Sequence, residues 1–297
     1  MSDTKRLLSY IRRAVDDYSM IEDGDKVAVG VSGGKDSLSL LTGLAALSRF
    51  YPKKFSLLAV TVDIGLPDTD FSAVEEYCRG LGVEYRVLKT EISKIIFDIR
   101  KESNPCSLCA KMRRGALNGF AASAGCNKVA LGHHFDDVIE TFMLNLFNEG
   151  RIGTFSPVTY LSNTGVTVIR PLVYMPEKDI RYLASKEGFP VVRSTCPADG
   201  NTDREKMKRM LAALDRENRG LRYRVFGAIK RAGLDGFRDV SRMQGIKAYA
   251  EDGGEGEPPQ YAEKTLDAMA EAKRIFSDPS VPGYSSMDEL KSALDSK

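Results

Sequence analysis

The residues from Val29 to Leu41, VGVSGGKDSLSLL, decide the fold of this chain. Lys26 to Val31 is a short β-branched apolar run typical of a buried strand, and Asp36 to Phe50 carries leucines at helical spacing. The glycines between them let the backbone approach an anion, and the first amides of the following helix favour negative charge there. The stretch therefore predicts a strand, a phosphate-binding turn and a helix.

The turn is not a Walker A loop. That motif needs four residues between its first glycine and a Gly-Lys pair that is followed by Ser or Thr. Here three residues separate Gly30 from Gly34-Lys35, and Asp36 follows the lysine. A glycine turn without a ligand is the alternative, but SGG, KDS and a preceding apolar strand coincide, which favours phosphate binding.

Strand-like and helix-like stretches alternate along the first two thirds of the chain. Four further apolar runs have the length of strands: Ser56–Asp63, Tyr85–Lys89, Lys128–Leu131 and Val166–Leu172. Buried strands that alternate with helices predict an α/β fold with a doubly wound parallel sheet. Ligands of such sheets bind at the carboxyl ends of the strands, where Ser32, Asp63 and Gly132 fall.

Composition excludes several classes of protein. The 297 residues are 42% hydrophobic and 28% charged, which is ordinary for a globular protein. The net charge is only +2, so binding to nucleic acid would depend on local clusters of positive charge. Residues 193–231 supply such charge, with eleven Lys and Arg against five Asp and Glu. The first twenty residues are too charged for a signal peptide and no apolar run approaches ~18 residues. We expect a cytoplasmic protein with no membrane contact.

A second polar cluster follows the fourth predicted strand, in LGHHFDDVIETF from Leu131. It holds the only two histidines of the chain, His133 and His134, next to Asp136 and Asp137. Paired carboxylates at a nucleotide site can hold Mg²⁺ through oxygen ligands, although the histidines could equally be structural. Arg170 ends the fifth predicted strand and is either a phosphate contact or an ordinary surface residue.

The cysteines suggest a metal site. Cys106 and Cys109 form a C-x-x-C that suits a zinc half-site, a redox pair or an iron–sulfur half-site. Cys196 is a third thiolate if the fold returns it to the same face, and three cysteines on a 4Fe-4S cluster leave one iron open. Cys78 and Cys126 lie in apolar surroundings, so we expect both to be buried.

Taken in order, SGGKDS, PCSLC with a trailing Arg-Arg-Gly, LGHHxDD, IRPL and a lone downstream cysteine resemble the tRNA 2-thiocytidine synthetase (TtcA) family of PP-loop ATP pyrophosphatases. The resemblance covers roughly residues 5 to 232, and Ser32 to Ser37 match the family's SGGxDS signature. It implies that ATP adenylylates the C2 oxygen of a tRNA cytidine, with release of pyrophosphate, and that sulfur then replaces this oxygen. The family often has a second C-x-x-C where this chain has Cys196 alone.

The resemblance also assigns roles to residues. It implies that Asp36 and Asp137 organise Mg²⁺-ATP and that Arg113 stabilises the pentavalent phosphate during catalysis. The expected cluster ligands are Cys106, Cys109 and Cys196, and the expected cofactors are a 4Fe-4S cluster, ATP and Mg²⁺. The expected ATP-binding residues are Ser32, Gly33, Gly34, Lys35, Ser37, Asp63, Gly132, Asp136 and Arg170.

Partners and organisation follow from the same reading. We expect tRNA to bind Arg113, Arg114 and the basic stretch from Arg204 to Arg231. We expect sulfide or a cysteine desulfurase to supply the sulfur. We also expect the chain to form a homodimer. The alternatives are a PP-loop ligase that delivers an amine, thiolation of another nucleotide, and a non-catalytic iron–sulfur RNA-binding regulator. The expected segments are an N-terminal helix (1–22), a PP-loop ATP-binding domain with the C-x-x-C segment inserted (23–192), a basic helical region (193–248), and an acidic linker with a helical tail (249–297).

Overall fold

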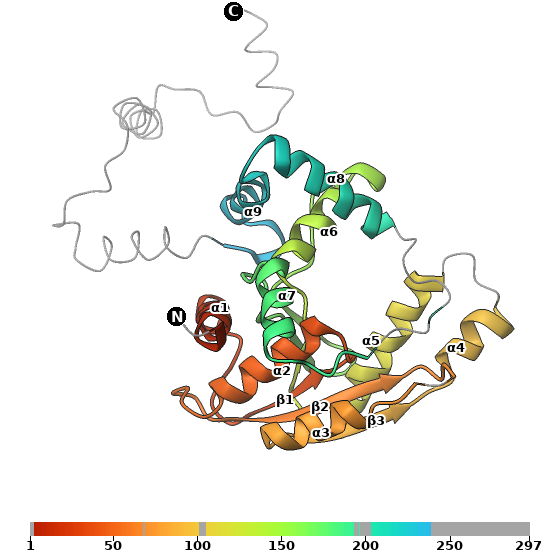
Figure 1. Ribbon diagram of the computed structural model, residues 1–297. Coiled ribbons are helices and arrows are strands. Elements are labelled where there is room, and N and C mark those ends of the chain that lie inside the picture. The colour runs from red at the N-terminus through yellow and green to blue at the C-terminus, as the bar shows by residue number, and fades with distance from the viewer. Residues whose placement is uncertain (1–2, 68, 101–104, 193–195, 197–202, 239–297) are drawn as a thin grey trace, which may run out of the picture. The chain divides into compact units, whose positions relative to one another are not determined.

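A six-stranded sheet forms the centre of the computed structural model, which describes residues 3–67, 69–100, 105–192, 196 and 203–238 (Figure 1). The strands follow the order β3-β2-β1-β4-β6-β5, and all except β5 are parallel. Their bounds are β1 Asp25–Gly30, β2 Phe55–Asp63, β3 Glu84–Lys89, β4 Lys128–Ala130, β5 Val158–Leu161 and β6 Val166–Ile169. The predicted α/β class with a parallel sheet is confirmed.

The edge of the sheet differs from the prediction. β5 pairs antiparallel with β6 through a turn in which Gly165 has φ +70°, and the predicted fifth strand stops at Ile169 instead of Leu172. Pro171 has no N–H to continue the ladder, which explains the early end. β5 has only four residues, too few to reveal a period.

Helices cover both faces of the sheet, as a doubly wound fold requires. The larger apolar core holds side chains of α1 (Asp3–Asp17), α2 (Lys35–Leu47), α3 (Ser72–Leu81), α6 (Phe135–Asn148), α7 (Glu177–Lys186), α8 (Asp203–Glu217) and α9 (Leu221–Arg231). The smaller core holds those of α4 (Ile92–Lys94), the π-helical turn η1 (Ile95–Ile99) and α5 (Pro105–Ser123). A 3-10 turn, η2 (Leu234–Gly236), follows α9.

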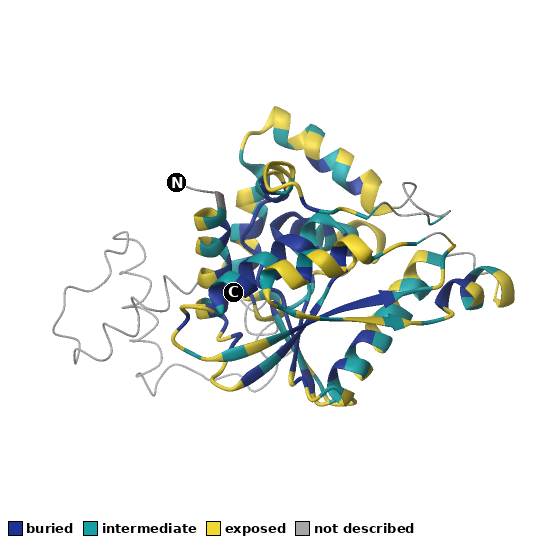
Figure 2. Ribbon diagram, turned by 60° about the horizontal axis from the view of Figure 1, so that its bottom comes forward, coloured by how far each residue is buried: buried dark blue, intermediate teal, exposed yellow. Residues whose placement is uncertain are grey.

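Alternation along β1 explains why this strand reads as a continuous apolar run. Val27 and Val29 belong to the larger core, and Ala28, between them, belongs to the smaller one. Because both faces of the strand are covered here, the positions from Val27 to Val29 are all apolar, and the charged residues Asp25 and Lys26 stand at the start of the strand. Figure 2 shows the buried residues concentrated along the central strands and the helix faces turned toward them.

The described residues belong to one compact unit, Met1–Asp239. The boundaries predicted at residues 22, 192 and 248 stay predictions, and the predicted acidic tail 249–297 lies outside the described residues. Among the residues that the structure describes, no helix has the length and apolar character needed to cross a membrane.

Candidate active site

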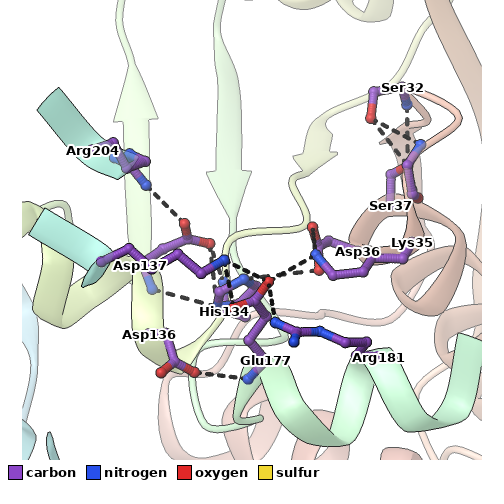
Figure 3. Close-up of polar contacts among 12 residues, drawn as sticks. Ser32, Lys35, Asp36, Ser37, His134, Asp136, Asp137, Glu177, Arg181 and Arg204 are labelled. Carbon is purple, nitrogen blue, oxygen red and sulfur yellow. Dashed lines mark hydrogen bonds and ion pairs between the residues drawn. The ribbon is translucent and has the colours of Figure 1, made fainter. Parts of the chain in front are cut away.

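The glycine turn between β1 and α2 is built by close backbone packing. Gly33 has φ +80°, and a Cβ there would lie 2.9 Å from Cβ of Val192, whose N–H donates to the Gly33 carbonyl over 3.0 Å. Ser37 Oγ accepts from the Ser32 N–H at 3.1 Å and donates to the Gly34 carbonyl at 2.9 Å (Figure 3). Only glycine fits at position 33, and the serines fix the path of the turn.

A second turn lies directly on the first. A Cβ on Gly132, which follows β4, would approach the backbone carbon of Asp36 to 3.1 Å. The absence of a side chain at Gly132 therefore allows the β4–α6 loop to rest against the first turn of α2. As a result, the N-termini of α2 and α6 and their acidic first turns lie side by side.

His134 joins the two acidic turns. It caps α6, where its Nδ1 accepts from the Asp137 N–H at 3.4 Å and its own N–H donates to Asp137 Oδ2 at 2.9 Å. Its Nε2 lies 3.8 Å from Asp36 Oδ1. This buried histidine thus holds Asp137 in place and points toward Asp36 (Figure 3).

A cavity of about 640 Å³ opens over these turns. It is lined by both carboxylates, Asp36 and Asp137, and by three arginines, Arg113, Arg114 and Arg204. The remaining lining residues are Gly30, Val31, Ser32, Ser37, Val60, Val62, Ser107, Ala110, Leu117, Leu131, Gly132 and His133. A cavity that contains two carboxylates, three guanidinium groups and a glycine turn suits a nucleotide bound together with a divalent cation.

Asp137 stays ionised. Burial by itself would raise the pKa of Asp137, but His134, whose ring and backbone N–H both face this carboxylate, and the Arg204 guanidinium lower it below the ordinary value. Asp36 Oδ2 accepts from Lys35 Nζ at 3.0 Å, whereas Asp36 Oδ1 is buried and has no hydrogen-bond partner among the described residues. An unpartnered carboxylate oxygen beside a second carboxylate is what a Mg²⁺ ligand pair offers, so these residues fit the ion.

His133 is held neutral at the cavity wall. Its Nδ1 accepts from Arg170 Nε at 3.3 Å, and burial together with that guanidinium lowers the pKa of His133 to about 4. The imidazole proton is therefore on Nε2 at neutral pH. Arg170 also donates to the Ser156 carbonyl at 2.6 Å and lies over the ring of Phe155, and it does not line the cavity.

Three more residues predicted for the ATP site are directed elsewhere. Lys35 Nζ lies 3.1 Å from the Glu177 carboxylate, and Asp136 accepts from the Glu177 N–H at 2.7 Å while it also pairs with Arg222. Asp63 accepts from the N–H of Gly65 at 2.9 Å. Lys35, Asp63 and Asp136 are not among the residues that line the cavity, so their contact with ATP stays a prediction.

Two of the three predicted cluster ligands share one turn of α5, and the third acts on them electrostatically. Cys106 and Cys109 are three residues apart near the start of α5, and the charges of Cys196 and Cys106 contribute, after burial, to raising the pKa of the Cys109 thiol. Within the described part of the chain, no three His, Cys, Asp or Glu side chains converge as ligands of one metal ion. The predicted burial of Cys78 and Cys126 is confirmed.

The sequence did not predict the contribution of α8 to this site. Arg204 Nη1 donates to Asp137 Oδ1 at 2.7 Å, and Lys208 Nζ donates to Glu177 at 2.8 Å. Both residues belong to the basic stretch that we expected to bind tRNA. The available signal was their spacing, because residues i and i+4 share one helix face, and Met207 and Leu211 show that this side of α8 is buried.

The chain is similar to known proteins in sequence and in fold. A family model described as a PP-loop domain matches residues 5–215. The tRNA-cytidine(32) 2-sulfurtransferase of Geobacter sulfurreducens is 41% identical over 228 residues, which are 76% of this chain and 89% of that protein. The protein of the same name from Pelobacter propionicus is 43% identical over 228 residues, 76% of this chain and 85% of the relative.

A solved structure shares the fold. The U34-tRNA thiolase NcsA from Methanococcus maripaludis, determined with its [4Fe-4S] cluster, superposes with a TM-score of 0.66. The match covers 87% of this chain and 91% of the thiolase at 24% sequence identity. At that identity the likeness concerns the arrangement of helices and strands.

Proposed function

The chain belongs to the PP-loop family and, within it, to the tRNA 2-thiocytidine synthetases, a family of enzymes, and from that premise we propose that it replaces the C2 oxygen of a tRNA cytidine with sulfur at the expense of ATP. One observation carries this proposal. A single cavity is lined by the glycine turn, by Asp36 and Asp137, and by the segment of α5 that includes Ser107 and Ala110, beside the cysteines. The nucleotide and the sulfur chemistry would therefore share one space.

The reaction has two steps. The cytidine C2 oxygen attacks the α-phosphorus of ATP, the bond between the α and β phosphates breaks, and pyrophosphate leaves. Sulfur then attacks C2, and the C2–O bond breaks with AMP as the leaving group. Both steps form charge on phosphate oxygens, which fixed cations and backbone N–H groups stabilise.

The lining residues take roles in these steps. Ser32 and Ser37 line the cavity and, with the backbone of Gly33 and Gly34 between them, would cradle the phosphates, and Asp36 with Asp137 would hold Mg²⁺. Arg113 lines the same cavity from α5, next to the cysteine turn, and neutralises charge on the α-phosphate during transfer. Gly132 permits the close approach of the two turns.

Residues outside the lining support the site indirectly. Burial and the Arg170 guanidinium keep His133 neutral by lowering its pKa, so that His133 offers an Nε2–H donor at the cavity wall. Lys35 and Asp136 join the first turns of α2 and α6 to Glu177, and Asp63 closes the turn after β2.

Three thiolates are a donor set that suits a 4Fe-4S cluster. We assign Cys106, Cys109 and Cys196 as its ligands, because the charges of Cys106 and Cys196 act on the Cys109 thiol. With three protein ligands, such a cluster supplies an iron that is open to a sulfur atom. We further propose sulfide or a cysteine desulfurase as the sulfur source, a homodimeric assembly and a cytoplasmic location.

The test uses the anaerobically reconstituted protein with unmodified tRNA, ATP, Mg²⁺ and sulfide. We expect mass spectrometry of digested tRNA to find 2-thiocytidine, and the nucleotide products to be AMP and pyrophosphate. Asp36→Ala should retain the fold and lose at least about 10²-fold in rate, because a charged group at an electrostatic site is removed. Glu76→Ala, on the exposed side of α3, is the matched control and should keep full activity.

Other outcomes identify the alternatives. Formation of ADP would contradict the PP-loop chemistry, and a different thiolated nucleoside would change the substrate. Incorporation of an amine in a reaction that needs no iron would indicate a ligase. Binding of tRNA without any cleavage of ATP would indicate a regulator.

A further inference from the structure

Arg204 is placed by α8 at the edge of the candidate ATP site. It is the second residue of this helix, 67 positions after Asp137 in the chain, and its side chain lines the cavity. Nη1 donates to Asp137 Oδ1 at 2.7 Å and Nη2 donates to Thr141 Oγ1 at 3.1 Å (Figure 3). The guanidinium therefore faces the same space as Asp36 and Arg113.

The two carboxylate oxygens of Asp137 have different partners. Oδ2 accepts from the His134 N–H at 2.9 Å and belongs to the cap of α6, so it cannot be released without disturbing that helix. Oδ1 is the oxygen that Arg204 holds. A Mg²⁺ ion carried by the nucleotide would take this same oxygen, and the ion would then compete with Arg204 for it.

Arg204 can leave Asp137 while α8 stays in place. Its side chain is 44% exposed, whereas that of Asp137 is 17% exposed. One turn further along, Lys208 lies 2.8 Å from Glu177, and Met207 and Leu211 are buried in the larger core. These contacts anchor the helix, so an exchange of partners at Arg204 requires only a change of side-chain rotamer.

The balance of charge gives the direction of this exchange. The cavity is lined by three arginines and two aspartates, and His133 is neutral. When Mg²⁺ occupies the carboxylates, the guanidinium loses its anionic partner inside a cavity that has just received phosphate oxygens. Arginine binds phosphate oxygens through two parallel N–H groups, and this contact is the nearest replacement.

We propose that Arg204 is a nucleotide-phosphate ligand, held by Asp137 in this structure and transferred to the phosphates when Mg²⁺-ATP binds. The inference rests on the proposed function, because it takes the cavity to be an ATP site. It also assigns to the nucleotide a residue that the charge pattern of the sequence had assigned to tRNA. Because α8 begins seven positions after Cys196, the contact would tie nucleotide binding to the helix that follows the third cysteine.

Isothermal titration with Mg²⁺-ATP and with AMP, in the absence of tRNA, tests the proposal on the full chain. For Arg204→Gln we expect roughly ten- to hundredfold weaker binding of ATP, the range for a hydrogen bond to a charged group, and a smaller change for AMP. Arg204→Lys should fall between, because lysine keeps the charge but not the paired donors. Lys206→Gln is the matched control: it removes the same charge from an exposed position of α8 that does not line the cavity, and its ATP affinity should equal that of the wild type.

Each remaining outcome is decisive. Arg204→Gln with wild-type or tighter ATP binding would overturn the proposal and leave Arg204 as a residue that only docks α8 on α6. Weaker tRNA binding of Arg204→Gln with unchanged ATP binding would show that Arg204 contacts tRNA and not the nucleotide. Failure of the wild-type protein to bind ATP would contradict the proposed function itself. Thermal unfolding of each variant establishes that the fold is retained.

Discussion

Lys35 Nζ lies 3.1 Å from Glu177 Oε1, so the lysine of the glycine turn is directed at the first residue of α7. The same carboxylate binds Lys208 from α8 at 2.8 Å. Glu177 thus connects the turn to two helices that come later in the chain. Burial alone would raise the pKa of Glu177, but Lys208 and Lys35 lower it to about 2.

Glu177→Gln should destabilise the fold in a pH-dependent way. The pKa of Glu177 falls from an ordinary 4.5 to about 2, which corresponds to roughly 3 kcal/mol in the free energy of unfolding. Because the folded-state pKa is the lower one, this contribution is complete above pH 4.5 and declines as the pH falls toward 2. Urea unfolding at pH 7, 5, 4 and 3 measures it.

The control for this variant is Glu187→Gln, at the exposed end of the same helix, which should change the free energy of unfolding by less than about 0.5 kcal/mol. A loss in Glu177→Gln that stays constant from pH 7 down to pH 3 would show that packing, and not the charge, is responsible.

His133 should remain neutral far below the pH at which an ordinary histidine is protonated. Its pKa is lowered from 6.5 to about 4, so its stabilising effect is complete above pH 6.5 and declines as the pH falls from there toward 4. The chain has two histidines, so proton NMR should give two imidazole C2–H signals, which His133→Gln assigns. A His133 signal that titrates near pH 6.5 would contradict the arrangement with Arg170.

Much of this site could be predicted because its parts are local in the sequence. Ser32 to Ser37 form one turn, and His134 and Asp137 form one helix cap, so short motifs carried the information. The partners of Asp137 and Glu177 on α8 could not be found in this way. Arg204 meets Asp137 across 67 residues of sequence, and a basic helix reads the same whether its charges face nucleic acid or a carboxylate of its own chain.

The fold shows the same division between local and distant information. The ends of β1, β2 and β4 were predicted within one residue, because these strands are largely apolar, whereas β6 ends three residues before its predicted end. β5 was missed, because a four-residue edge strand gives no period and is defined only by its pairing with β6. Lys35 illustrates the limit at the level of one side chain: its place in SGGKDS suggested a phosphate contact, and its direction depends on Glu177.

Gly33→Ala should destabilise the fold by more than the strain of an alanine with positive φ. Alanine at φ +80° is strained by about 1–3 kcal/mol, and its Cβ would also lie 2.9 Å from Cβ of Val192. Gly82→Ala is the matched control, because Gly82 has φ +73° and nothing within 4 Å of a Cβ. We expect Gly33→Ala to lower the free energy of unfolding more than Gly82→Ala does.

A double-mutant cycle isolates the contact. Val192→Ala retains the Cβ but removes Cγ2, also 2.9 Å from the added Cβ, so it should recover part of the loss in Gly33→Ala. Equal losses in Gly33→Ala and Gly82→Ala, measured by urea unfolding, would mean that the segment at Val192 moves aside without cost.

Sulfur transfer should not need Cys78 or Cys126. Both thiols are buried, and burial raises the pKa of Cys78 to about 11 and that of Cys126 above its ordinary value, so neither supplies the thiolate that persulfide chemistry requires. The double variant Cys78→Ala with Cys126→Ala should lose roughly 1 kcal/mol of stability per site and still thiolate tRNA with sulfide and ATP.

Cys109→Ala is the comparison: it should lose bound iron, measured by metal analysis of anaerobic protein, together with thiolation. Loss of thiolation in the double variant, with iron and fold retained, would make Cys78 or Cys126 the sulfur carrier. Stoichiometric zinc without iron in the wild type would instead remove the iron–sulfur cluster from the proposal.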